Sequence, residues 1–440
     1  MDVERLRRDA EAGIAGAQYN LGVWHLFGES GRKDAEQARK WFLAAADQDF
    51  APAQSALGFL YQRAQGVEQD FSIARSWFDR AARQDFPEAL YCLGELLALG
   101  LGGNRDAAAA RRCYERAAEQ GHPAAIGQLA YCEDYGIGGP ADPVAATRWY
   151  SNAVSAGDPR ALFAIARRYE SGNTVPENRV KARALYQLAE DKNYPLAAER
   201  GHRIADTLDE KSVEEATSLA AEPFEIDIPD SSNLAPEVPG APENLSMKPW
   251  VATIRHLITP DECAYMMNTA RPNLHPSRVL RQASGELAET SGRTSGEMTF
   301  GDGLKNLVVH NVERRLAQVA GFPVENGEAL IILHYDEGDE YRPHYDYFDP
   351  ERAGTSAVLE RGGQRVCTLL TYLNDVPAGG ETDFPEVGLK VAPEVGMGVL
   401  FFNVRADGSV DPATRHAGCP VRAGEKWLAT KWFREHAVPK

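Results

Sequence analysis

The stretch Tyr341-Arg-Pro-His344-Tyr-Asp346-Tyr-Phe348 decides how the second half of this 440-residue chain is interpreted. Side chains at positions i and i+2 of a strand point to the same face, so His344 and Asp346 are expected to lie side by side. His416 follows 70 residues after Asp346, and Lys426 comes 10 residues after that. An imidazole from a distant strand could join the first two side chains on one face of a metal ion.

A second pair of the same form, His334-Tyr-Asp336, lies just upstream, and spacing alone does not choose between the two pairs. The downstream pair is favoured by its neighbours, because Tyr341, His416 and Lys426 accompany it in order. Two histidines and one carboxylate with open positions opposite them are the ligand set of non-haem Fe(II) oxygenases. The lysine fits the need to hold the far carboxylate of a 2-oxoglutarate cosubstrate.

Short strands separated by turns rich in Gly and Pro dominate the second half, which predicts a double-sheet barrel of jelly-roll type. The expected strands are 251–257, 329–335, 364–373, 396–402, 416–421 and 426–433. Two helices are expected, one with Thr259 as its N-cap and one over 302–319. Within 426–433, Lys426 and Trp432 share one face, and a lysine inside a barrel calls for an anionic ligand.

The first half contains a repeat with a period of 36 residues, marked by Ala17, Ala53, Ala89, Ala125, Ala161 and Ala197. Leu-Gly pairs follow the first three of these alanines, and Leu129-Ala130 and Ile165-Ala166 follow the next two. The second half of each unit carries one of the pairs Trp41-Phe42, Trp77-Phe78, Cys113-Tyr114, Trp149-Tyr150 and Leu185-Tyr186. Each unit is interpreted as two antiparallel helices that bury their apolar faces only by stacking on neighbouring units. The aromatic residues are expected to form the core between repeats, and the concave surface could bind a peptide.

Composition narrows the class of protein further. The net charge of −17 disfavours a nucleic-acid partner, because phosphate binding relies on clustered Lys and Arg. Six scattered cysteines form no disulfide framework, which predicts reduced thiols in a cytoplasmic protein. We expect no signal peptide and no membrane span, because the N-terminus lacks an apolar segment and no run of 18 apolar residues occurs.

The predicted organisation is an all-α helical-repeat solenoid followed by an α+β double-stranded β-helix (jelly-roll) domain. The repeat array is assigned to residues 1–207, an acidic proline-rich linker to 208–246, and the jelly-roll domain to 247–440. Acidic, proline-rich chain resists packing, although Phe224–Ile228 alternates as an edge strand would.

Both halves resemble known families. The Ala, Leu-Gly and Trp-Tyr pattern over roughly residues 10–207 resembles the Sel-one-like branch of tetratricopeptide-like repeats, whose arrays generally bind proteins. Residues 247–438 resemble the prolyl 4-hydroxylase catalytic domain. The segments that carry this second resemblance are Leu333–Phe348, Gly362–Val366, Tyr372–Val376, Gly379–Thr382, Asp411–Trp432 and Arg293-Thr-Ser295.

The second resemblance implies a role for each motif residue. By it, His344, Asp346 and His416 ligate Fe(II), and Tyr335 hydrogen-bonds the cosubstrate. Thr382 and Lys426 bind the distal carboxylate of 2-oxoglutarate, Trp432 lines that pocket, and Arg365 and Tyr341 face the peptide.

The implied activity is 4-hydroxylation of a peptidyl proline with Fe(II), 2-oxoglutarate and O2, supported by L-ascorbate, on a protein substrate docked partly by the repeats. Oxidation of another side chain or of a small molecule stays open, because the motifs fix the oxidant and not the substrate. A repeat scaffold with a non-catalytic oxygenase-like domain is a further alternative, and nucleic-acid demethylation is disfavoured by the acidic balance.

Overall fold

The structure, a computed structural model, describes residues 2–28, 33–221, 226–228, 239–281, 286–289, 293–301, 305–349, 351 and 355–438. Of residues 278–281 and 286–289 it describes the backbone alone. The chain divides into two compact units: Met1–Asn178 with Pro223–Pro236, and Arg179–Glu222 with Glu237–Lys440. The domain limits expected at 207 and 247 therefore differ from the compact units and stay a prediction.

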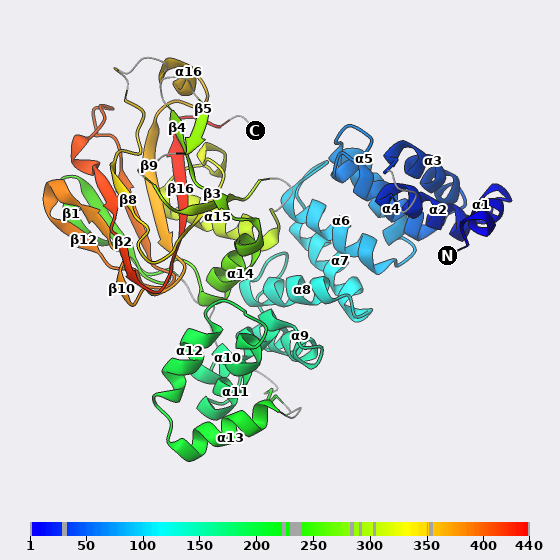
Figure 1. Cartoon of the computed structure of the whole chain (residues 1–440), viewed down its shortest axis with the longest axis horizontal. Helices are drawn as coiled ribbons and strands as arrows, with labels where there is room; N and C mark the ends of the chain where they lie inside the picture. The colour runs from blue at the N-terminus through cyan, green and yellow to red at the C-terminus, as the bar shows by residue number, and fades with distance from the viewer. Residues whose placement is uncertain are drawn as a thin grey trace. The chain divides into compact units, whose positions relative to one another are not determined.

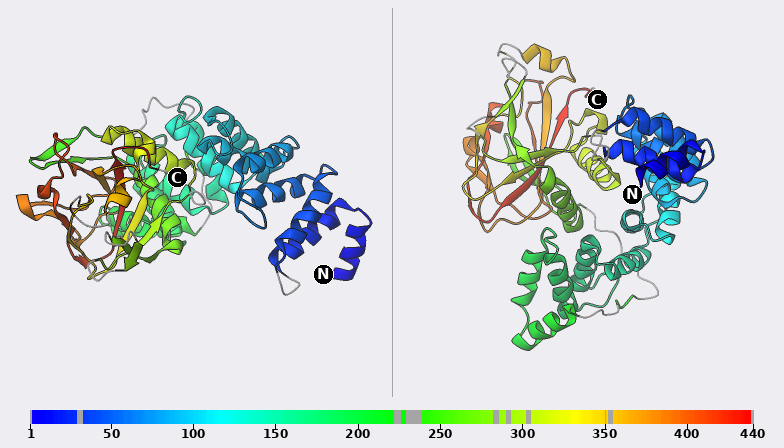
Figure 2. Two further views of the ribbon diagram at one scale, coloured as in Figure 1. Left: turned by 90° about the horizontal axis from the view of Figure 1, so that it is seen from above. Right: turned by 45° about the vertical axis from the view of Figure 1, so that its right-hand side comes forward.

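The first unit is a stack of helices that can be followed from blue to cyan in Figures 1 and 2. Its helices are α1 (Val3–Glu11), α2 (Ala15–Phe27), α3 (Ala35–Ala46), α4 (Ala51–Gln62), α5 (Phe71–Ala82), α6 (Pro87–Leu99), α7 (Ala107–Glu119), α8 (Pro123–Tyr135), α9 (Pro143–Ser155) and α10 (Pro159–Ser171). Two helices recur in every 36 residues, as the repeat predicted.

The second helix of each pair begins at an aspartate that also recurs with the repeat. Asp34, Asp70, Asp106 and Asp142 each accept a hydrogen bond at 2.9 Å from the backbone N–H three residues later. Such caps satisfy one of the unpaired N–H groups of the first turn. The period of the sequence is therefore a period of helix starts.

Within a pair, the two helices approach closely because a glycine of the first helix faces an aromatic ring of the second. A Cβ atom at Gly22 would lie 2.6 Å from the Phe42 ring, and one at Gly58 would lie 2.7 Å from the Phe78 ring. These rings are fully buried. The Leu-Gly signature is thus a packing requirement.

Three helices open the second unit: α11 (Arg179–Glu190), α12 (Ala197–Ala205) and α13 (Glu210–Ala220). Helix α13 corrects the prediction that extended chain begins at 208. Asp209 caps it at Ser212, and every proline of the acidic segment comes after residue 222, so nothing breaks a helix before that point. The edge strand expected over Phe224–Ile228 lies partly outside the described residues, and 226–228 carry no strand.

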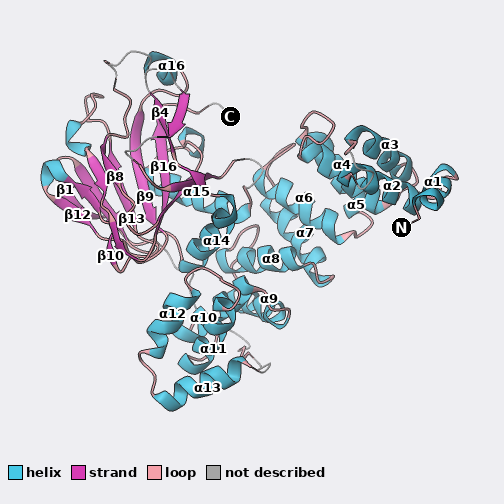
Figure 3. Cartoon of the chain, in the orientation of Figure 1, coloured by secondary structure: helices cyan, strands magenta, loops and turns pink. Residues whose placement is uncertain are grey.

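The rest of the second unit is built on sheets (Figure 3). The largest sheet has the order β1-β2-β13-β9-β16-β7-β6-β3, and a four-stranded sheet has the order β12-β11-β14-β8. Two short pairs, β10 with β15 and β4 with β5, complete the set found in the described residues. The strands are β1 (Glu243–Met247), β2 (Trp250–Ile254), β3 (His275–Pro276), β4 (Arg278–Arg281), β5 (Glu286–Glu289), β6 (Gly296–Thr299), β7 (Ile331–Tyr335), β8 (Tyr341–His344), β9 (Arg365–Tyr372), β10 (Ala378–Gly379), β11 (Thr382–Phe384), β12 (Leu389–Val391), β13 (Gly398–Phe402), β14 (His416–Gly418), β15 (Val421–Ala423) and β16 (Lys426–Arg434).

The core lies between the two larger sheets. Its buried cluster joins Tyr372 and Phe401 of the large sheet to Phe384 and Val391 of the small one. Helices α14 (Pro260–Ala270) and α15 (Leu307–Ala320) contact strands of the large sheet, and the short α16 (Thr355–Leu359) precedes β9. A helical array followed by a double-sheet domain confirms the predicted fold class.

Two expected strands differ in detail. The expected strand over 416–421 is two strands, because Cys419 and Pro420 leave the small sheet between β14 and β15. His344 and Asp346 are predicted to share one strand, but strand β8 ends at His344 and Asp346 lies beyond it. The predicted N-cap at Thr259 is confirmed, and it forms a reciprocal capping box with Glu262.

All six cysteines are free thiols, and five of them are buried. Among the described helices, none combines the length and apolar character that a membrane span requires.

We predict that Gly58→Ala lowers the free energy of unfolding by about 1–3 kcal/mol, because the new methyl group would overlap the buried Phe78 ring. Urea unfolding followed by circular dichroism measures the change. Gly16→Ala is the matched control, since a Cβ there meets no heavy atom within 4 Å. Equal effects of the two substitutions would contradict this account of the helix contact.

Candidate metal centre and adjoining cavity

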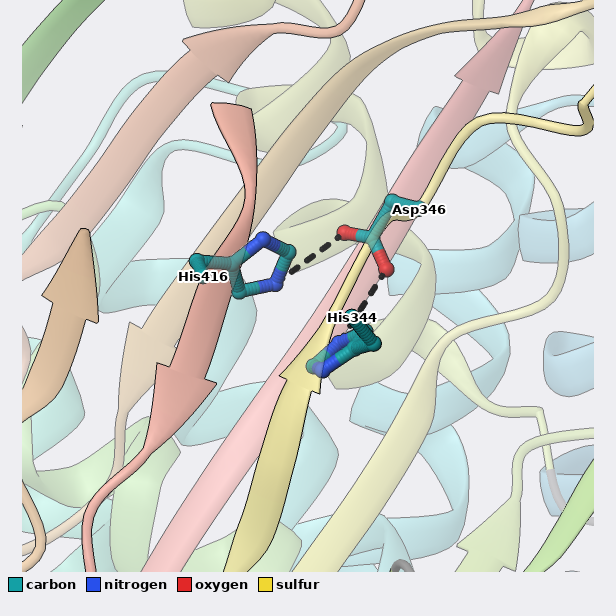
Figure 4. Close-up of side chains that lie close together, drawn as sticks. All are labelled: His344, Asp346 and His416. Atoms are coloured by element: carbon teal, nitrogen blue, oxygen red, sulfur yellow. Dashed lines mark ion pairs between the residues drawn. The ribbon is translucent and has the colours of Figure 1, made fainter. Parts of the chain in front are cut away.

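Two histidines of the small sheet and Asp346, two residues beyond the end of β8, converge on one another (Figure 4). His344 ends β8 and lies opposite His416, the first residue of β14, in the antiparallel ladder. The Asp346 carboxylate lies between them, with one oxygen 3.7 Å from His344 Nε2 and the other 3.6 Å from His416 Nε2. Within the described part of the chain, this is the one group of three or more such ligands close enough to hold a metal ion.

Backbone carbonyls fix how both imidazoles present themselves. His344 Nδ1 lies 2.9 Å from the Arg342 carbonyl oxygen, and His416 Nδ1 lies 3.0 Å from the Thr414 carbonyl oxygen. A carbonyl can only accept, so each Nδ1 carries the proton and each Nε2 keeps a free lone pair toward Asp346. This second contact is typical of histidines that ligate metals.

Asp346 is oriented by a chain of hydrogen bonds. Thr368 Oγ1 on β9 donates to Asp346 Oδ2 at 2.8 Å, and Asn403 Nδ2 donates to that hydroxyl at 2.9 Å. Burial acts to raise the pKa of Asp346, but His416 and His344 outweigh it and lower the pKa below its usual value. Burial, together with His416, lowers the pKa of His344 to about 3. An ionised carboxylate beside a neutral imidazole is the protonation state that binds a divalent cation.

A cavity of about 410 Å³ adjoins the three side chains. Five predicted site residues outside the triad line it, namely Tyr335, Tyr341, Thr382, Lys426 and Trp432. The strand parity that placed Lys426 and Trp432 on one side is therefore confirmed by β16.

Lys426 gives the cavity its electrostatic character. The side chain is only 2% exposed, and its Nζ lies 5.3 Å from the Tyr335 ring centre and 5.6 Å from that of Tyr372. Among the described residues, no carboxylate pairs with this amine. Burial lowers its pKa to about 8, against the opposing effects of Cys419 and Glu381. A buried amine that lacks a counter-ion fits an anionic ligand.

Arg365, which is predicted to face the peptide, makes its observed contacts beside the cavity. It is absent from the cavity lining, and its guanidinium makes two hydrogen bonds to Glu328 at 2.7 and 2.8 Å. The guanidinium also lies 3.7 Å from the Trp432 ring centre and donates to the Asp346 backbone oxygen at 3.4 Å. These contacts make Arg365 a support for the site, and its contact with substrate stays a prediction.

The upstream pair is excluded as a three-ligand centre by its surroundings. His334 Nε2 lies 2.8 Å from Glu425, and its ring packs on Trp427. The Asp336 side chain is 79% exposed. The structure therefore brings together His344, Asp346 and His416 and leaves His334 outside.

Some residues of the site carried no recognisable role in the sequence. Arg293 lines the cavity, where its guanidinium stands 5.1 Å from the Tyr341 ring centre. Thr368 on β9 and Asn403 just after β13 orient Asp346 from positions outside the quoted motifs. Only Arg293 had a signal, because it opens the short segment that resembled the family.

Comparison with known proteins agrees with this geometry. Residues 330–434 match the family model of the 2OG-Fe(II) oxygenase superfamily. Five consecutive segments, 15–50, 51–86, 87–122, 123–158 and 159–194, match the Sel1 repeat. The oxygenase match contains every predicted site residue, and that superfamily implies Fe(II), 2-oxoglutarate and O2.

Individual relatives narrow the family. The probable prolyl 4-hydroxylase 10 of Arabidopsis thaliana is 35% identical over an alignment of 213 residues that covers 44% of this chain and 72% of that relative. Prolyl 4-hydroxylase 5 of the same plant is 37% identical over an alignment of 213 residues that covers 44% of this chain and 71% of that relative. The structure of a viral collagen prolyl hydroxylase from Paramecium Bursaria Chlorella virus-1 has a TM-score of 0.33, 26% identity, and coverage of 42% of this chain and 95% of that one. The sequence identity to the two plant enzymes shows that this chain is a 2-oxoglutarate-dependent dioxygenase and belongs to the prolyl 4-hydroxylase family.

Proposed function

We propose that this enzyme hydroxylates peptidyl proline at C4 in a protein substrate that the helical repeats help to hold. The observation that carries the proposal is that one cavity holds both a group of metal-binding side chains and a buried amine. One side presents the Asp346 carboxylate between the imidazoles of His344 and His416, and the other presents the buried Lys426 amine. The first suits Fe(II) and the second suits a dicarboxylate, and relatives of this chain are named prolyl 4-hydroxylases.

The chain's own residues divide the work of binding. His344, Asp346 and His416 hold Fe(II), while Lys426 and Thr382 bind the distal carboxylate of 2-oxoglutarate. Tyr335 donates a hydrogen bond to the cosubstrate, and Trp432 closes the side of the cavity. Bound Fe(II) supplies the redox chemistry by which O2 converts 2-oxoglutarate to succinate and CO2 and one oxygen atom enters a C–H bond of the substrate. L-ascorbate would keep the iron reduced.

The remaining residues position the substrate and shelter the reaction. Tyr341 stacks on His344 with ring centres 3.6 Å apart, which places it beside the metal ligands at the cavity wall. Arg365 holds Trp432 and the backbone of Asp346 in place and also faces the peptide. A dry cavity strengthens every charge interaction inside it and keeps water from the reacting atoms. The thiol state of the cysteines supports a cytoplasmic location.

The decisive experiment supplies the iron-loaded enzyme with proline-containing peptides, 2-oxoglutarate and O2. We expect succinate and one added oxygen on proline in a one-to-one ratio, and hydrolysis of the product to give 4-hydroxyproline. Oxygen on another side chain, or succinate coupled only to a small molecule, would transfer the activity to a different substrate. Iron binding without any turnover would favour a non-catalytic scaffold.

We predict that His344→Ala, Asp346→Ala and His416→Ala each reduce bound iron from about one equivalent to nearly none, because two ligands rarely retain a divalent ion. Elemental analysis of the purified proteins measures the iron. His334→Ala is the matched control and keeps its iron, since His334 pairs with Glu425 at 2.8 Å outside the centre. Loss of iron in His334→Ala and retention in His344→Ala would reassign the centre.

We predict that Lys426→Met weakens 2-oxoglutarate binding by at least roughly 30-fold, or about 2 kcal/mol, because the variant leaves a buried carboxylate without its cation. Calorimetric titration of the Zn(II)-loaded protein measures the affinity without turnover. Lys390→Met is the control, because Lys390 lies exposed on β12. A similar loss in both variants would mean that general charge, not Lys426, attracts the ligand.

The same titration has a predicted dependence on pH. In the ligand-free cavity the Lys426 amine has a pKa of about 8. Below that pH the amine is charged and ready to bind; above it, binding requires proton uptake. Affinity for 2-oxoglutarate therefore falls as pH rises through 8, approaching tenfold per unit. Lys426→Met should abolish that slope, and an unchanged slope would assign it to another group.

A further inference from the structure

A groove opens on the helical array between α5 and α7, with α6 beneath it. Its volume is about 1270 Å³. The apolar floor includes Leu93 and Leu97 of α6 and Cys113 of α7, and arginines of α5 and α7 stand along its sides. The groove lies wholly within the first compact unit.

The 36-residue register explains why the array is open at this place. Five residues are equivalent to one another: Trp41, Trp77, Cys113, Trp149 and Leu185. Trp41 packs on the cluster that contains Leu21, and Trp77 packs on the cluster that contains Leu57. The equivalent of these two leucines is Leu93, which lines the groove because the small Cys113 stands where an indole packs in the first two repeats.

The sides of the groove are cationic in a chain whose net charge is −17. Four arginines and two aspartates line it, and Asp106 is occupied in capping α7. Arg83 pairs with Asp79 at 2.7 Å, whereas Arg112 is exposed and has no hydrogen-bond or ion-pair partner among the described residues. Arg112 therefore offers a free charge beside an apolar floor.

We infer that this groove docks an acidic segment of another polypeptide, which inserts one aromatic side chain over Leu93 and Cys113. An indole is the side chain that fits, because the two preceding repeats pack their own tryptophan on the cluster of the equivalent leucine. Carboxylates flanking the aromatic residue complement Arg112, because Arg83 and Arg116 already pair with Asp79 and Asp85. An aromatic anchor in an apolar pocket with charged surroundings is a common source of binding energy in protein interfaces. The inference stands independently of the proposed hydroxylation.

The probe is a fluorescein-labelled synthetic peptide with one tryptophan flanked by glutamates, titrated with the full chain and followed by fluorescence anisotropy. We expect Cys113→Trp to weaken binding by roughly 10- to 100-fold, because the new indole fills the site of the anchor. Replacing the peptide's tryptophan by alanine should weaken binding to a similar degree. Thermal unfolding of Cys113→Trp shows whether the array stays folded, and Cys113→Leu is the milder filling variant.

Arg112→Glu tests the charge, and Arg148→Glu is its matched control. Arg148 occupies the equivalent position 36 residues later and is exposed. The residue after it is Trp149, so its repeat has the indole that the repeat of Cys113 lacks. We expect Arg112→Glu to weaken binding by at least about tenfold and Arg148→Glu to leave it unchanged. The inference is overturned if the wild type fails to bind the peptide, if filling the groove in a folded variant leaves binding intact, or if both arginine variants lose binding equally. Turnover of a short proline peptide reports on the catalytic proposal separately.

Discussion

The antiparallel register between β8 and β14 is the constraint on which the catalytic half of the chain depends. Pairing His344 with His416 places their Cβ atoms within the reach of directly opposed residues, so both imidazoles can share one ion with Asp346. A slip of one residue would turn one histidine to the opposite face of the sheet. The register is secured elsewhere, since Phe384 of β11, next to β14, packs against Phe401 of the large sheet at 5.2 Å between ring centres.

Burial of charge is the second requirement of the site. Asp346 and Lys426 are 6% and 2% exposed, and a charge removed from water is costly unless something compensates it. Asp346 accepts a hydrogen bond from the Thr368 hydroxyl and lies beside two imidazoles, whereas Lys426 lies near two aromatic rings and has no ion-pair partner among the described residues. A divalent cation and a dicarboxylate would supply the missing compensation, and each would therefore stabilise the fold as it binds. The groups that recognise the ligands therefore lower the stability of the fold when no ligand is bound.

Sequence reasoning succeeded where the signal was local. The repeat period, the Thr259 cap and the parity of Lys426 and Trp432 depend on residues a few positions apart, and the structure confirms all three. It failed at long range. Arg365 is separated by 37 residues from Glu328, its bidentate partner, and no pattern announces that pairing. Asp346 was placed on a strand because its spacing from His344 fits one, but spacing cannot show where a strand ends. The aspartate caps recur with the 36-residue period, but a single aspartate does not by itself predict a helix start, because aspartate is also common in turns.

The two adjacent aromatic positions of the repeat have separate tasks, and this explains how one of them can be lost. Tyr114 keeps the first task, because its ring packs on Gly94, where a Cβ would lie 2.6 Å away. Cys113 is too small for the second task, which is to cover the leucine of the repeat. In a stack where each unit contacts only its neighbours, such a loss stays local. The helix pair α6–α7 can therefore stay packed while the surface above Leu93 is open. A repeat array can in this way form a groove at one repeat without losing stability in the others.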